Sequence, residues 1–179
     1  MTKRPGRRLA AWFAAGLTAA AVLQAPRAAA QEASRADATK AAMIYNFGRF
    51  TTWAPNRFAR SSDPVVLCVD PSDSFAGTLE SIDGKALDGR VLVVKRTSRF
   101  DRDCTMAYVS AANASPAYLT RLRDHGVLTI GETRDFASAG AIQLVTVGRQ
   151  IRFEINQKNA ISAGAHLSSN LLRLAITVR

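Results

Sequence analysis

Apolar residues recur at helical spacing in an early segment of the chain. In residues 40–53 they lie three or four positions apart, at Met43, Ile44 and Phe47. This spacing predicts an amphipathic helix that buries one face. Pro55 follows directly, and because proline cannot continue a helix we expect the helix to end before it.

Short runs rich in β-branched residues come next, and they predict strands. The run 65–69 is apolar throughout and lies between Pro64 and Pro71, which is typical of a strand covered on both faces. Near the carboxyl terminus, two runs flank Gly148 and predict a β-hairpin. The predicted strands are 65–69, 90–96, 105–110, 127–130, 141–147 and 151–156.

Helical segments separate these strands. Residues 72–82 predict a short helix capped by Asp73 or Ser74. Pro116 suits the first turn of a helix that ends near Gly126. Residues 157–175 predict one final helix, with its buried face at Ile161, Leu167, Leu171, Leu172 and Leu174. Alternating strands and helices predict a layered α/β domain with a mainly parallel sheet of about six strands, an antiparallel carboxyl-terminal hairpin and flanking helices.

The first thirty residues form a predicted signal peptide. A basic start is followed by an apolar stretch from Leu9 to Leu23, and Ala28–Ala30 offers a small-residue cleavage site. The alternative is a membrane anchor, but the apolar stretch is shorter than the ~20 residues that a spanning helix needs. We therefore expect residues 1–30 to be removed on export and residues 31–179 to form a single domain, with residues 31–37 frayed.

Cleavage changes the charge of the chain. The whole sequence has a formal net charge of +10, with 24 basic and 14 acidic residues. Five basic residues lie in the first thirty, so the mature chain has a net charge of about +5. The remaining basic residues are spread from Arg35 to Arg179 without an aromatic-interleaved stripe, which argues against nucleic-acid binding. The expected surface is a solvated basic one.

Several segments together carry a resemblance to a known family. They are KAAMIYNF at 40–47, LCVD at 67–70, VLTIGE at 127–132, IRFEIN at 151–156 and SSNLLRLA at 168–175. In this order they resemble the YfiR-like family over essentially the whole mature chain. The resemblance implies a periplasmic α/β protein that binds the sensor domain of an inner-membrane diguanylate cyclase and represses it, which lowers cyclic-di-GMP signalling and biofilm formation. The resemblance is also consistent with a homodimer.

The two cysteines, Cys68 and Cys104, match family cysteine positions. Export would place them in an oxidising compartment, where two cysteines without other cysteine partners usually form a disulfide. The alternative is two separate buried thiols. The spacing argues against a redox enzyme, which would want C-x-x-C. The characterised repressor of the family has a second cysteine pair near the segment matching 136–144, and that pair is absent here.

Four polar residues are candidates for ligand or partner binding: Glu154, Asn156, Ser168 and Ser169. We expect the first two on the polar side of the last strand and the serines near the middle of the final helix. The alternative is that all four satisfy backbone groups where helix and strand meet. Phe47, Phe50 and Trp53 raise a similar question, since aromatic residues at helical spacing form either the core or a partner-binding surface.

No enzyme chemistry is expected. His125 and His166 are the only histidines, and no Asp, Glu or Cys cluster surrounds them at ligand spacing, so the sequence predicts no metal site. No catalytic residue and no cofactor is predicted. The leading hypothesis is a regulator that acts by protein binding. The second is a periplasmic small-molecule-binding or sensor-accessory protein, which a pocket would favour.

Overall fold

The computed structural model describes Thr2 and residues 25–179. The chain divides into two units, Met1–Ala33 and Ser34–Arg179, and the second carries the folded domain. Within the described residues, no helix is long and apolar enough to cross a membrane. The apolar run of the predicted signal peptide lies outside the described residues. Residues 31–37, expected to be frayed, belong instead to the helix α1.

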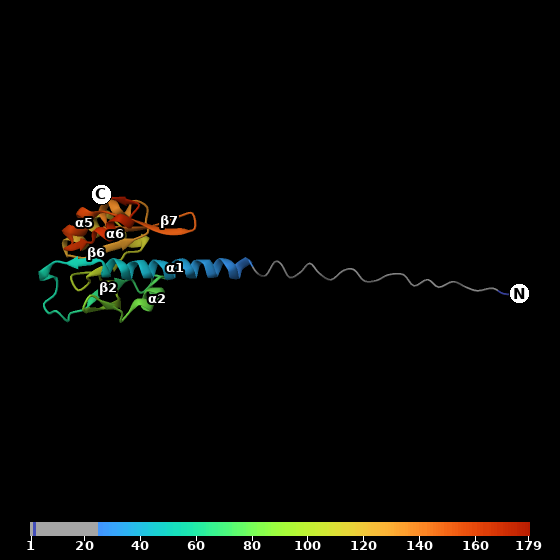
Figure 1. Cartoon of the computed structure of the whole chain (residues 1–179), viewed down its shortest axis with the longest axis horizontal. Helices are drawn as coiled ribbons and strands as arrows, with labels where there is room; N and C mark the ends of the chain where they lie inside the picture. Colours follow the sequence, from blue (N-terminus) through green and yellow to red (C-terminus); the bar gives the residue numbers. More distant parts are fainter. Residues whose placement is uncertain (1, 3–24) are drawn as a thin grey trace. The chain divides into compact units, whose positions relative to one another are not determined.

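The domain is organised by one eight-stranded sheet in the order β10-β8-β7-β6-β5-β2-β4-β3. The strands β4, β2, β5, β6 and β7 are mutually parallel, β8 is antiparallel to β7, and β10 is parallel to β8. The bounds are β2 Val65–Val69, β3 Ala86–Leu87, β4 Arg90–Arg96, β5 Met106–Tyr108, β6 Leu128–Gly131, β7 Ile142–Val147, β8 Gln150–Ile155 and β10 Thr177–Val178. The β7–β8 hairpin extends beyond its neighbours (Figure 1).

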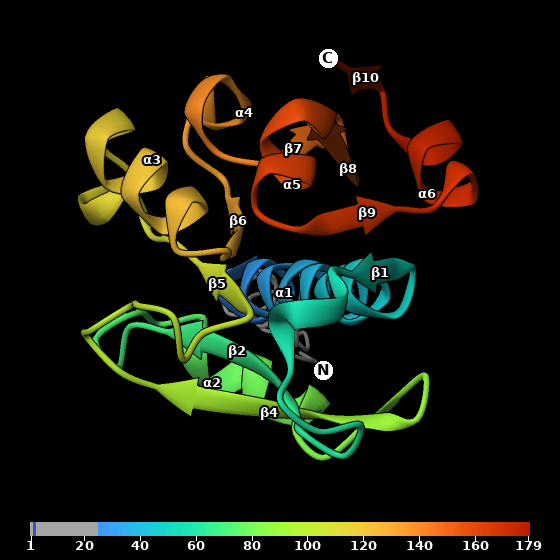
Figure 2. The ribbon, with the colours of Figure 1, turned by 90° about the vertical axis from the view of Figure 1, so that its left-hand side faces the viewer.

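Helices cover both faces of this sheet. They are α1 Ala25–Arg49, α2 Ala76–Leu79, α3 Pro116–Asp124, α4 Phe136–Ala139, α5 Gln157–Ser162 and α6 Ser169–Leu174, with 3₁₀ turns at Pro55–Arg57, Glu80–Ile82 and Ala111–Asn113. The carboxyl-terminal part of α1 lies between β2 and β5 on one side and the short strand β9 (Ala165–Leu167) on the other (Figure 2). On the opposite face of the sheet, α3 packs over β6 and α4 over β7.

The two faces have separate cores. Ile44 and Phe47 of α1 are almost fully buried against side chains from strands β2 to β8. On the other face, Leu119 and Leu122 of α3 pack against a smaller cluster that includes both cysteines. A strand buried on both faces needs apolar residues at every position, which is why β2 reads as a continuous apolar run.

The first predicted helix ends earlier than expected. The structure places the end of α1 at Arg49, and residues 51–53 form strand β1 (Thr51–Trp53). This strand pairs antiparallel with β9 (Ala165–Leu167) in a separate two-stranded sheet. Thr51 and Thr52 are β-branched and favour extended structure, so the partner strand outweighs helical spacing here. Pro55 begins a 3₁₀ turn instead of ending the helix.

The predicted final helix over residues 157–175 is wrong. The segment is divided into α5, strand β9 and α6. Gly164 ends α5 with φ +71°, a conformation in which other residues are strained, and the chain then runs extended to Ser168. Ile161 and Leu174, expected on the buried face, are exposed. The apolar residues of α5, β9 and α6 happen to lie at helical spacing, which is why the sequence predicted one continuous helix.

Other expectations are corrected in length or confirmed. The helix expected over residues 72–82 is only α2 followed by a 3₁₀ turn, and Asp73 accepts a hydrogen bond from the N–H of Phe75 just before it. The sheet has eight strands where about six were predicted, and the two additional strands are β3 and β10. Confirmed features include the strand 90–96, the β7–β8 hairpin, and the helix that Pro116 begins and Gly126 follows with φ +76°.

Candidate functional site

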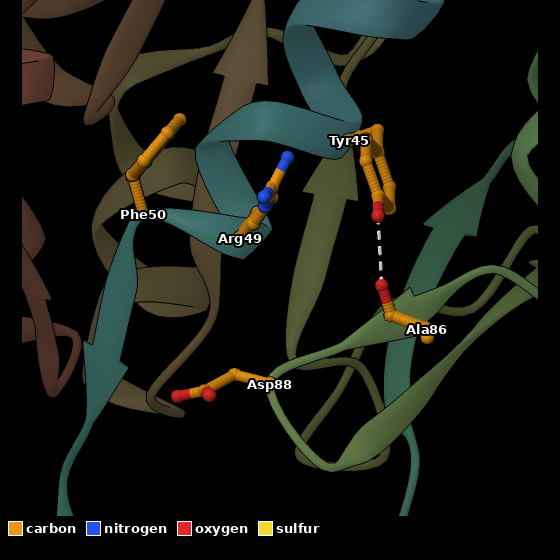
Figure 3. Close-up of a pocket in the computed structure, with 5 residues that line it drawn as sticks. All are labelled: Tyr45, Arg49, Phe50, Ala86 and Asp88. Atoms are coloured by element: carbon orange, nitrogen blue, oxygen red, sulfur yellow. Dashed lines mark hydrogen bonds between the residues drawn. The ribbon is translucent and has the colours of Figure 1, made fainter.

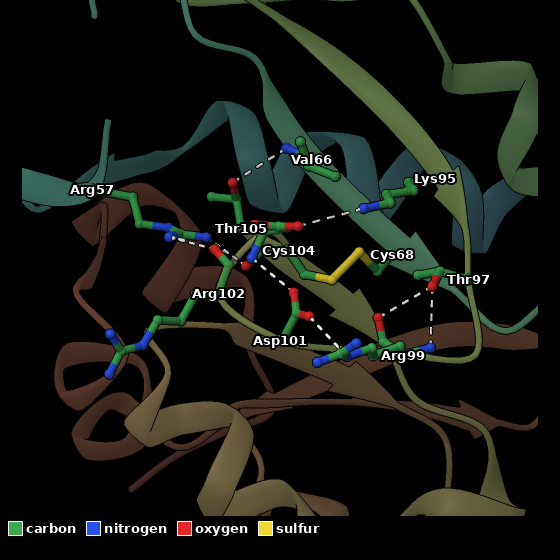
Figure 4. The surroundings of a disulfide bond; sticks show 11 residues. Arg57, Val66, Cys68, Lys95, Thr97, Arg99, Asp101, Arg102, Cys104 and Thr105 are labelled. Carbon is green, nitrogen blue, oxygen red and sulfur yellow. Dashed lines mark hydrogen bonds and ion pairs between the residues drawn. A yellow bond between two sulfur atoms is a disulfide. The ribbon is translucent and has the colours of Figure 1, made fainter. Parts of the chain in front are cut away.

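The structure contains the disulfide between Cys68 and Cys104, with the two Cα atoms 5.6 Å apart. Cys68 lies in β2, and Cys104 lies two residues before the neighbouring strand β5 (Figure 4). Both residues are completely buried. The bond therefore joins β2 to the end of the loop that runs from β4 into β5.

A half-buried arginine, Arg57, ties this loop to another part of the chain. The Arg57 guanidinium donates hydrogen bonds to the backbone carbonyls of Arg102 and Cys104 (Figure 4). Burial lowers the pKa of Arg57, while the charge of Asp103 acts in the opposite direction. On the same loop, the Thr105 hydroxyl accepts a hydrogen bond of 3.2 Å from the N–H of Val66. These hydrogen bonds satisfy backbone groups of the loop beside the disulfide, which indicates a structural role for this region.

The four polar candidates also mainly contact the protein itself. Glu154 forms a 2.6 Å ion pair with Arg179. Asn156 accepts from the N–H of Asn159 at the start of α5 and donates to the carbonyl of Ala137. Ser168 caps α6 at its start rather than lying within a helix, and Ser169 is the exposed first residue of α6. A binding role for these residues stays a prediction.

A second polar cluster lies at the carboxyl ends of the parallel strands. From β2 the chain adds β4 on one side and then returns to add β5, β6 and β7 on the other side. The strand order therefore reverses between β2 and β5, the position where open α/β sheets usually bind ligands. Here the chain's own side chains meet. The Tyr108 hydroxyl donates to Glu132 at 2.7 Å, and Lys40 of α1 pairs with Glu132 at 2.9 Å. The Phe75 ring packs against Tyr108, with 4.9 Å between centroids.

The cluster strongly favours one protonation state. Burial and then the hydrogen bond to Glu132 raise the pKa of Tyr108 far above its usual value, so its hydroxyl remains a donor. Burial lowers the pKa of Lys40, but the hydrogen bonds and charges of Glu132 and Asp37 outweigh burial and leave it raised. Lys40 therefore stays charged and links α1 to Glu132, which directly follows the carboxyl end of β6.

Two adjoining hollows lie between the end of α1, β1 and the β3–β4 turn. The larger has a volume of about 580 Å³ and is lined by Tyr45, Arg49, Phe50, Ala86 and Asp88 (Figure 3). The smaller has a volume of about 180 Å³ and is lined by Gly48, Thr51, Thr52, Trp53, Ala54, Pro55, Phe58, Val65, Leu87, Asp88 and Arg90. Asp88 lines both, so we treat them as one groove, the β1 groove. Its larger hollow falls within the roughly 300–1,000 Å³ of ligand pockets.

The walls of the β1 groove are held by specific contacts. The Tyr45 hydroxyl donates to the carbonyl of Ala86 at 2.8 Å, which fixes β3 against α1 (Figure 3). The Arg90 guanidinium lies 3.7 Å from the centroid of the Phe58 ring. Asp88 and Gly89 have φ +43° and +81°, as a two-residue hairpin turn requires. This turn aims the Asp88 side chain toward β1 (Figure 3).

Sequence reasoning missed the β1 groove. The dipeptide Asp88–Gly89 is a strong hairpin signal that could have located β3 and its turn. The aromatic residues divide between the two readings: Phe47 is core, while Phe50 is exposed and Trp53 half-buried beside the groove. Of the histidines, His125 follows α3 and His166 lies exposed in β9. From residue 25 onward, no group of three potential metal ligands is present.

The fold and the disulfide define the class: a small α/β domain with a mainly parallel sheet, cross-linked between two adjacent strands. A family model described as DUF4154, YfiR/HmsC-like, matches residues 37–176, and the chain belongs to this family. Among solved structures it is similar to a conserved domain protein from Vibrio cholerae O1 biovar eltor, at 12% identity and a TM-score of 0.44. That match covers 64% of this chain and 54% of the other, so the chain spans about half of that protein's length. No curated protein matches the chain.

Proposed function

We propose that this chain is a periplasmic regulatory protein. It binds the periplasmic sensor domain of an inner-membrane diguanylate cyclase and represses the enzyme, which lowers cyclic-di-GMP. The observation that carries the proposal is the match to the YfiR/HmsC-like family over residues 37–176. The buried disulfide adds support, because such bonds persist in oxidising compartments.

Repression by binding needs no catalytic group. A ligand shifts a two-state protein when it binds one state better than the other. The regulator therefore needs only a surface that fits the inactive state of the sensor domain. The titratable cluster of Lys40, Tyr108 and Glu132 is internally paired, and this supports a structural role for it rather than an acid–base one.

A small-molecule-binding protein is the second candidate, and the larger hollow of the β1 groove favours it. The two candidates differ in what the purified protein carries. Native mass spectrometry of protein isolated from the periplasm would reveal a small molecule that survives purification. A bare protein that binds a sensor domain would favour the regulator.

Direct binding tests the proposal. The mature chain, residues 31–179, is titrated calorimetrically with purified periplasmic domains of the diguanylate cyclases encoded in the same genome. We expect one domain to bind with a dissociation constant in the micromolar range or below. If none of the domains binds, the proposed partner is wrong.

A further inference from the structure

Strand β1 has one open edge. Its other edge pairs with β9, where the N–H of Ala54 donates to Gly164 at 2.8 Å and the N–H of Ser168 donates to Phe50 at 2.9 Å. Bonded and non-bonded pairs alternate along an antiparallel ladder. The backbone groups of Thr52 therefore face β9, and those of Trp53 face away from it. Among the described residues, β1 pairs with no second strand.

The β1 groove lies directly beside β1. The residues of β1 line the smaller hollow on one side, and Leu87, Asp88 and Arg90 line it on the other. The same hollow reaches the apolar side chains of Val65 and Phe58. An extended chain laid along β1 would thus find main-chain partners at Trp53 and an apolar recess beside it.

The charges around the groove are unequal. Arg49 and Lys85 are exposed cations, and each lies over an aromatic ring at 5.8 and 5.5 Å from its centroid. Arg90 adds a third positive charge. Among the described residues that line the two hollows, Asp88 is the one carboxylate. The rim therefore favours a segment with negative charge.

Two other sheet edges, those of β4 and β10, are less suited to pairing. The outer edge of β4 is partly closed, because the N–H of Val94 donates to the Asp83 carboxylate at 2.7 Å and the N–H of Leu92 donates to Lys85 at 2.8 Å. At the opposite end of the sheet, β10 has only two residues. Proteins commonly blunt their edges in these ways, and β1 combines an open edge with an adjoining groove.

We propose that an extended acidic segment of the protein partner adds as a strand to the open edge of β1. Its backbone pairs with Trp53, one apolar side chain enters the smaller hollow, and a carboxylate meets Arg49 or Lys85. Strand addition of this kind draws affinity from main-chain hydrogen bonds and specificity from side-chain pockets. The inference rests on the proposed function, since the partner is the sensor domain named there.

Two substitutions at one position separate backbone pairing from side-chain packing. Trp53→Ala removes the ring and keeps the N–H, whereas Trp53→Pro removes both. The probes are the intact sensor domains and overlapping synthetic peptides tiled across them, and binding is measured by fluorescence anisotropy. We expect one acidic peptide to bind, and Trp53→Pro to bind it about tenfold more weakly than Trp53→Ala because a ladder hydrogen bond is lost. Asp88→Asn is expected to strengthen binding severalfold.

Each outcome has a definite meaning. If a sensor domain binds and the two Trp53 variants bind it equally, strand addition is refuted while the proposed function stands. If neither domains nor peptides bind, both proposals fail. If sedimentation shows a dimer of this chain that Trp53→Pro abolishes, the edge belongs to a second copy and the inference is overturned. Should Trp53→Pro not fold, amide hydrogen exchange of the wild type decides, because the Trp53 amide must gain protection when the peptide binds.

Discussion

Removing the cross-link between Cys68 and Cys104 is expected to destabilise the domain substantially. The bond joins residues separated by 36 positions in sequence. In the chain-entropy account, closing a loop of that length in the unfolded state is worth about 4 kcal/mol. Typical domains have only about 5–15 kcal/mol of total stability, so the loss would be a large fraction of it.

Two perturbations separate the cross-link from the packing of the sulfur atoms. Reduction with dithiothreitol breaks the bond and keeps both sulfurs, whereas the double substitution Cys68→Ala with Cys104→Ala also removes them from a fully buried site. We expect reduction to lower the free energy of unfolding by about 4 kcal/mol. The double variant should lose more, because truncation in a packed core leaves a cavity.

Urea unfolding of residues 31–179, followed by the fluorescence of Trp53 and by circular dichroism, measures these differences. Dithiothreitol should have no effect on the double variant, which serves as the control for the reagent. If reduction lowers the free energy of unfolding by less than about 1 kcal/mol, the cross-link does not stabilise the domain as proposed. Such a result would mean that the β4–β5 loop and its contacts with Arg57 hold the two strands together without the bond.

Three further predictions concern stability. The raised pKa of Tyr108 means that its contribution is present below the unfolded value of about 10 and is lost as pH rises further, so Tyr108→Phe should flatten the alkaline fall in urea midpoint. Asn156→Ala should cost about 1–2 kcal/mol in urea unfolding, because the variant loses the α5 cap and the bond to Ala137. Gly131→Ala would place a Cβ 2.4 Å from the Phe136 ring and should lower the melting temperature, whereas a Cβ at Gly77 would lie 3.8 Å from its nearest neighbour and should be nearly neutral.

The sequence predicts the sheet better than the elements around it. Strands such as β2 are buried on both faces, and that requirement appears directly as a continuous apolar run. The region after β8 has no such direct pattern. Gly164 with positive φ interrupts what reads as a leucine stripe, and pairing between β1 and β9 depends on residues more than a hundred positions apart.

The candidate sites follow the same division. The disulfide between Cys68 and Cys104 could be expected, because both residues match family cysteine positions and export would place them in an oxidising compartment. The β1 groove could not, because its walls come from residues near 50 and near 88 that meet only after folding. Asn156 and Ser168 were candidates for ligand or partner binding, with the alternative that they satisfy backbone groups, and the structure shows that both cap helices.

The cellular concentration of cyclic-di-GMP reports directly on whether this chain represses a diguanylate cyclase. It is quantified by mass spectrometry in wild-type cells, in a strain that lacks this gene, and in a strain that lacks both this gene and the cyclase whose sensor domain binds the chain. We expect cyclic-di-GMP to rise in the single deletion, to return to the wild-type level on complementation, and not to rise in the double deletion. Unchanged cyclic-di-GMP in the single deletion, with the cyclase expressed, would contradict the proposed repression.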